Sequence, residues 1–134
     1  AVLNPACIES GGATHMFYRA VRKRDMVSSI GYCQLEGNKA VKRSATPVLF
    51  PEQDHEKMGV EDPRIVCVDG VYYLFYTVYD GKNALVAYAT STDLVHFVKQ
   101  QVISPRITYR DAAQLFERSP IKLREKYFVL IKDG

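Results

Sequence analysis

The sequence predicts an all-β fold in which a group of short strands recurs along the chain. Three observations lead to this prediction. Five segments are rich in aromatic and β-branched residues, which strands favour. Turn-forming residue pairs lie between several of these segments, and similar segments recur at a nearly constant spacing. Strong helical periodicity is absent from every window longer than two helical turns, so helices contribute little to the expected fold.

The expected strands follow one another along the chain, and turn residues separate them. Asp69-Gly70 lies between RIVCV and VYYLFY, where Asp-Gly favours a two-residue type I′ turn and therefore a β-hairpin. Gly37-Asn38 and Asp80-Gly81 predict two further turns. The five strand segments are HMFYRAV (15–21), SSIGYCQL (28–35), VYYLFYTVY (71–79), ALVAYATS (84–91) and KYFVLIK (126–132).

A repeat of about 58 residues runs through these segments. Pro5 and Pro63 are 63 − 5 = 58 residues apart, and Tyr18 and Tyr76 are 76 − 18 = 58 residues apart. Repeated units of several short strands are typical of β-propeller blades. We predict a single partial β-propeller domain over residues 1–134, with units of about 1–58, 59–108 and 109–134. The alternative is a β-sandwich that contains two similar hairpins.

The number of units bears on the size of the protein. The chain holds 134/58, or about 2.3, units, whereas propellers close with roughly four to eight blades. We therefore expect the N-terminal part of a longer protein, or a fragment that a partner chain completes.

Composition excludes several classes of function. A formal net charge of +3 without a long basic run argues against nucleic acid as a partner. No apolar stretch approaches the roughly 18 residues of a membrane helix. The three cysteines form no C-x-x-C pair, and the three histidines show no ligand spacing. We expect free thiols, a cytoplasmic location and no metal site.

Polar residues gather where the strands of each unit begin. Glu61, Asp62 and Arg64 flank Pro63, whose ring favours an extended conformation for Asp62. Strand alternation would then place Asp62 and Arg64 on one side and Glu61 on the other. Asn4 precedes a proline one unit earlier. Polar groups that converge from several blades predict a ligand pocket. The third unit opens with Arg110 and Asp111.

Structural interpretations compete with this hypothesis. Glu61, Asp62 and Arg64 could form a loop ion pair that caps the strand and contributes little energy. Arg19 lies inside MFYRAV, where its counterpart one unit later is Thr77. A buried arginine requires an anionic partner or a polar ligand, whereas an arginine on an exposed edge would extend into solvent.

The motifs NPA, FYRA, GVEDPRI, YYLFYTVYDG and STDLVHF resemble the β-mannoside (mannooligosaccharide) phosphorylases, glycoside hydrolase family 130. The resemblance runs from Leu3 to Lys132. It implies a five-bladed β-propeller and inverting phosphorolysis of β-mannosides to mannose 1-phosphate. Near the third unit, LFERSPIKLREKY departs from the LFPEK-x-x-GKY pattern that is common in the family.

The resemblance also implies roles for individual residues. Asp62 matches the catalytic proton donor, and Asn4 and Arg19 match residues that hold the sugar before the scissile bond. Arg110 lies where the family reaches toward phosphate. Further substrate contacts are expected at Glu61, Arg64, Asp80 and Asp111.

An inverting phosphorylase needs one acid, because phosphate is itself the nucleophile, and a cationic cradle for which arginine is well shaped. The expected partners are an oligosaccharide and inorganic phosphate as co-substrate, with no cofactor, nucleic acid or membrane. A homo-oligomer or further C-terminal blades would complete the fold. The alternatives are a glycoside hydrolase on the same fold, acting on β-mannosides, arabinofuranosides or fructans, and a non-catalytic carbohydrate-binding fragment.

Overall fold

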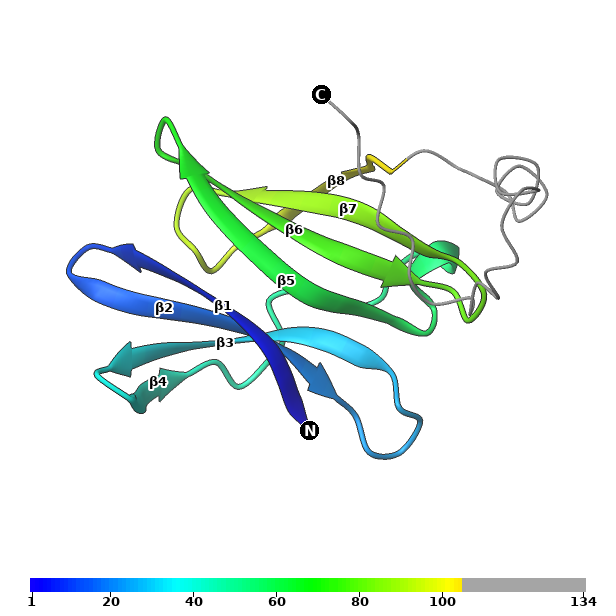
Figure 1. Cartoon of the computed structure of the whole chain (residues 1–134), viewed down its shortest axis with the longest axis horizontal. Helices are drawn as coiled ribbons and strands as arrows, with labels where there is room; N and C mark the ends of the chain where they lie inside the picture. The colour runs from blue at the N-terminus through cyan, green and yellow to red at the C-terminus, as the bar shows by residue number, and fades with distance from the viewer. Residues whose placement is uncertain (105–134) are drawn as a thin grey trace, which may run out of the picture.

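The computed structural model describes residues 1–104 and confirms an all-β fold in that part of the chain (Figure 1). The predicted strand 126–132, the unit 109–134, Arg110 and Asp111 lie outside the described residues. One short 3₁₀-helix, η1 (Asp54–Glu56), interrupts the strands. The strands are β1 (Val2–Ser10), β2 (Ala13–Val21), β3 (Ser28–Glu36), β4 (Lys39–Arg43), β5 (Gly59–Val68), β6 (Val71–Tyr79), β7 (Ala84–Ser91) and β8 (Val98–Val102).

The strands form two antiparallel meanders, β1–β4 and β5–β8 (Figure 1). In the described residues, one parallel pair, Ser28 with Gly59, joins β3 to β5 and makes the open sheet continuous. The first strands of the two meanders, β1 and β5, also lie against each other. The start of the second meander is therefore held next to the start of the first.

The repeat that the sequence predicts is present in the strand positions. β6 begins at 71 and ends at 79, and β2 begins at 13 and ends at 21, so both bounds differ by 58. The bounds of β6 and β7 are those predicted. Asp69 and Gly70 have φ values of 50° and 79°, both positive as a type I′ turn requires. The hairpin prediction is therefore confirmed, whereas the division of the whole chain into units stays a prediction.

A single apolar core connects the two meanders. Phe17 and Ile30 of the first meander are fully buried in the same cluster as Val60 and Leu74 of the second. Phe97, in the loop between β7 and β8, packs edge-on against Phe17 with ring centroids 5.5 Å apart. Each such buried side chain stabilises the fold by roughly 1.5–3 kcal/mol. This shared core fixes β1 and β5 relative to each other.

A buried ion pair fastens the segment that leads into β5. The Glu56 side chain is 1% exposed and accepts a hydrogen bond from Lys99 Nζ at 2.6 Å. Its Oε2 atom also accepts the backbone N–H groups of Glu52 and Gln53 at 2.9 and 3.3 Å. Lys99 donates in addition to the Phe50 carbonyl at 2.6 Å. Because Lys99 belongs to β8, these contacts tie the segment before Gly59 to the last strand of its own meander.

We expect Lys99→Met to lower the free energy of unfolding by about 3 kcal/mol, because it leaves the Glu56 carboxylate buried without its cation. Lys42→Met removes the same charge from exposed β4 and is the matched control. Urea unfolding of both variants measures the difference. Equal midpoints for the two variants would show that the buried pair does not hold this segment.

Candidate active site

The two strand starts share an unusual backbone conformation. Asn4 and Asp62, each followed by a proline, have φ values of 48° and 51°. Each lies at an irregularity in strand pairing, between Leu3 and Ala6 in β1 and between Glu61 and Arg64 in β5. The expectation that Pro63 holds Asp62 extended is therefore wrong. The bulge places Asp62 in the left-handed region, which Asp and Asn tolerate better than other non-glycine residues.

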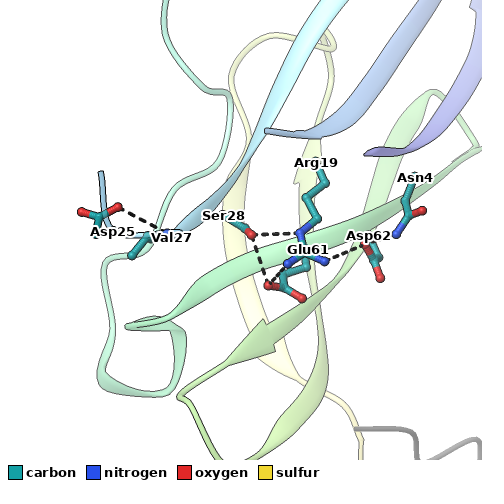
Figure 2. Close-up of polar contacts among 7 residues, drawn as sticks. All are labelled: Asn4, Arg19, Asp25, Val27, Ser28, Glu61 and Asp62. Atoms are coloured by element: carbon teal, nitrogen blue, oxygen red, sulfur yellow. Dashed lines mark hydrogen bonds and ion pairs between the residues drawn. The ribbon is translucent and has the colours of Figure 1, made fainter. Parts of the chain in front are cut away.

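These bulges bring repeat-equivalent side chains together. Asn4 Nδ2 donates a hydrogen bond to Asp62 Oδ1 at 2.6 Å, across a separation of 58 residues. Figure 2 shows the Asn4 amide next to the Asp62 carboxylate. The polar groups that begin the first two units are therefore in contact, and a ligand pocket between them stays a prediction.

Arg19 of β2 connects both carboxylates of β5 (Figure 2). Its Nη2 atom donates to Glu61 Oε1 at 2.6 Å, and its Nη1 atom lies 3.7 Å from Asp62 Oδ1. Arg19 therefore has the anionic partner that a partly buried arginine requires. The expectation that Glu61 faces away from Asp62 is wrong, because the bulge interrupts the regular alternation of side chains.

Ser28 joins the cluster of polar side chains formed by Asn4, Arg19, Glu61 and Asp62, and it was not identified from the sequence. Its fully buried hydroxyl accepts from Arg19 Nε at 2.9 Å and lies 3.2 Å from Glu61 Oε1. The only signal in the sequence is a polar residue at the start of a strand. Gly59 makes room for it: a Cβ atom on Gly59 would lie 2.9 Å from Ser28 Cβ, and its φ of 152° is strained for other residues.

Within the cluster, Asp62 is the more solvent-exposed carboxylate and Glu61 is the more buried one. The Asp62 side chain is 39% exposed, whereas those of Arg19 and Glu61 are 24% and 15% exposed. Within residues 1–104, one side-chain hydrogen bond, from Asn4, and the Arg19 ion pair reach Oδ1 of Asp62, and none reaches Oδ2. A carboxyl group that is anchored through one oxygen and open at the other has the geometry of a proton donor or acceptor.

Two other predicted residues lie outside this cluster. Arg64 is exposed and donates to the Pro63 carbonyl at 2.7 Å, and it makes no ion pair with Asp62. The loop ion pair between Arg64 and Asp62 is therefore absent.

Asp80 accepts hydrogen bonds from the backbone N–H groups of Asn83 and Lys82 and from the Asn83 side-chain amide, all within 2.9 Å. Hydrogen bonds from Asn83, backbone first, lower the pKa of Asp80 to about 2. Asp80 thus closes a turn, and its contact with substrate stays a prediction.

The described residues contain neither a cluster of metal-ligating side chains nor a membrane-spanning helix. Residues 1–104 contain no group of three or more His, Cys, Asp or Glu side chains that could hold a metal ion. In the same range, no helix is long and apolar enough to cross a membrane.

The family follows from comparison with known proteins. A family model described as beta-1,4-mannooligosaccharide phosphorylase matches residues 1–133. The chain belongs to this family, glycoside hydrolase family 130. Beta-1,2-mannobiose phosphorylase of Thermoanaerobacter sp. (strain X514) is 35% identical over 133 residues, which are 88% of this chain and 44% of that protein. The 1,2-beta-oligomannan phosphorylase of the same organism is 32% identical over 139 residues, covering 97% of this chain and 45% of that protein.

The chain therefore spans less than half the length of these curated relatives. A solved structure from the GH130 family of mannoside phosphorylases is 32% identical, with a TM-score of 0.67 over 75% of this chain and 31% of that chain. That family is described there as containing glycoside hydrolases that target beta-1,2 mannosidic linkages in Candida mannan. The fold and the membership of a family of carbohydrate-active enzymes are thus established together.

We expect Arg19→Met to lower the free energy of unfolding by about 2 kcal/mol, because it removes the hydrogen bonds from Arg19 to Ser28 and Glu61 and the cation between the Glu61 and Asp62 carboxylates. Arg22→Met is the matched control: it breaks an exposed ion pair with Asp25, which contributes little. Thermal unfolding of the two variants compares them. A control that melts as early as Arg19→Met would contradict a stabilising role for the cluster.

Proposed function

We propose that the protein containing this chain is an inverting β-mannoside phosphorylase on a five-bladed β-propeller, with Asp62 as its general acid. The observation that carries the proposal is the half-exposed Asp62 carboxylate, held by Asn4 and Arg19 where two repeat units meet. Membership of a phosphorylase family and the two phosphorylase relatives support the reaction class.

The proposed reaction breaks the glycosidic bond with a single acid. Asp62 donates its proton to the glycosidic oxygen, directly or through a sugar hydroxyl, while a phosphate oxygen attacks the anomeric carbon from the opposite face. The bond to the leaving sugar breaks, and mannose 1-phosphate of inverted configuration forms. Asn4 and the free side of Arg19 would bind sugar hydroxyls. Exposed Arg64 would contribute to the phosphate site together with Arg110, which lies outside the described residues.

A hydrolase is the second candidate, favoured by the hydrolases described for the same family. An inverting hydrolase needs a second carboxylate that is free to activate water, about 6.5–9.5 Å from the acid. Glu61 is a poor candidate for that base, because its side chain is only 15% exposed, against 39% for Asp62, and its Oε1 atom is the principal partner of Arg19. For the part of the site that residues 1–104 provide, the burial of Glu61 supports the phosphorylase over the hydrolase.

The setting of the reaction stays at the level of prediction. Cys7, Cys33 and Cys67 are free thiols, which agrees with a reducing compartment such as the cytoplasm. The family model names β-1,4 linkages and both relatives name β-1,2 linkages, so both belong in any assay. Assembly into a homo-oligomer stays a prediction from the sequence.

We expect the full-length protein to form mannose 1-phosphate from β-1,2- or β-1,4-mannobiose only when inorganic phosphate is present, since phosphate is the nucleophile. Product analysis with and without phosphate measures this dependence. Release of free mannose at an equal rate without phosphate would show that water is the nucleophile and that the protein is a hydrolase.

We expect Asp62→Asn to lower turnover at least about a hundredfold, because the amide cannot donate the proton. Asp69→Asn is the matched control, since Asn-Gly suits the type I′ turn at the other end of β5 as well as Asp-Gly does. Rates are expressed per folded molecule, with the melting temperature recorded for each variant. An Asp62→Asn variant with near-normal turnover would refute its role as general acid.

A further inference from the structure

The hydrogen bonds around Arg19 form a closed ring. Arg19 Nε donates to Ser28 Oγ at 2.9 Å, Ser28 Oγ lies 3.2 Å from Glu61 Oε1, and Arg19 Nη2 donates to that same oxygen at 2.6 Å (Figure 2). The ring joins β2, β3 and β5, and all three side chains are buried or half-buried. It thus ties both meanders together at the candidate active site.

The direction of each hydrogen bond in the ring follows from chemistry. A guanidinium can only donate, so the Ser28 hydroxyl oxygen accepts from Arg19. The Ser28 hydrogen must then point elsewhere, and the Glu61 carboxylate, which can only accept when ionised, is its acceptor. Ser28 therefore links the cation and the anion in one fixed orientation.

This orientation determines where the remaining nitrogen of Arg19 points. Because the guanidinium is planar, two directed hydrogen bonds at Nε and Nη2 fix its plane and its rotation. Nη1 is left 3.7 Å from Asp62 Oδ1, on the side where Asn4 also donates to that oxygen. Loss of the Ser28 contact would free the guanidinium to turn while Glu61 still held one end.

The location of Ser28 supports a role beyond the local contact. Ser28 is fully buried and is the residue that pairs with Gly59 at the junction of the two meanders. A Cβ atom on Gly59 would lie 3.2 Å from Glu61 Oε1, so backbone and side chains are closely packed there. Removal of the Ser28 hydroxyl would therefore alter the hydrogen bonds of Arg19 and Glu61. Because Ser28 is fully buried, this effect would not come from a direct contact with substrate.

We propose that Ser28 is a positioning residue for the reaction: with Glu61, it fixes the Arg19 guanidinium so that Nη1 is directed at Asp62. The proposal rests on the proposed function of Asp62. Ser28 acts through Arg19, so its contribution to turnover depends on the presence of the planar guanidinium.

The test is a double-mutant cycle in the full-length protein, with β-mannobiose and inorganic phosphate as substrates. Ser28→Ala is expected to lower kcat about tenfold, within the cost of misplacing a positioned group, and to change KM for mannobiose less than kcat. In the Arg19→Lys background, the same Ser28→Ala change is expected to have no further effect on kcat, because lysine lacks the Nε–H that Ser28 accepts. Additive effects of the two substitutions on kcat would overturn the proposal.

Two controls separate the outcomes. Ser29→Ala, the same change at the next residue of β3, is expected to leave kcat unaltered; an equal loss there would overturn the proposal. Ser28→Cys, of similar size, serves if Ser28→Ala does not fold, and it is expected to lose activity as well. If neither variant folds, Ser28 is a folding residue and the proposal is wrong.

Asp62→Asn is assayed in parallel. If the Asp62→Asn enzyme is active, the proposed role of Asp62 as general acid is wrong. An inactive Asp62→Asn enzyme beside a Ser28→Ala enzyme of normal kcat would overturn only the positioning role.

Discussion

The candidate site depends on the ion pairs that the Arg19 guanidinium makes with Glu61 and Asp62. One cation faces two carboxylates of the same strand, at 2.6 Å from Glu61 and 3.7 Å from Asp62. Without it, the two negative charges would repel each other in a partly desolvated place, where screening is weaker than in bulk water. The shorter contact makes Glu61 the principal counter-ion. Asp62 is thereby held near the guanidinium while its second oxygen stays open.

This arrangement requires a break in regular strand geometry. In an undisturbed strand, Glu61 and Asp62 would lie on opposite faces of the sheet, and Arg19 could reach only one of them. The bulge at Asp62 turns both toward Arg19, and the bulge at Asn4 turns the amide toward the same carboxylate. The same irregularity in two repeat units thus produces a contact between equivalent residues that neither unit could form alone.

How much the sequence could predict depends on how local each feature is. The aromatic and β-branched residues of VYYLFYTVY and the Asp69-Gly70 pair are local signals, and they predicted β6 and the hairpin correctly. The conformation of Asp62 was predicted wrongly, since a proline restricts its predecessor but does not reveal a bulge. Ser28 and the buried pair of Glu56 with Lys99 could not be predicted, because their contacts join residues 33 and 43 positions apart.

The charges in the cluster also separate two tasks in the proposed reaction. The charge of Arg19 is nearly neutralised by Glu61. Arg19 is therefore better suited to donate directed hydrogen bonds to a neutral sugar than to attract a phosphate dianion. Arg64, which makes no ion pair within residues 1–104, keeps its charge on the surface of β5. The proposed reaction would use the two arginines differently. In the proposed reaction, Arg19, fixed in plane by Glu61, would orient the acid, and exposed Arg64 would attract the nucleophile. The two arginines belong to neighbouring units of the repeat, so the site depends on the packing of one unit against the next.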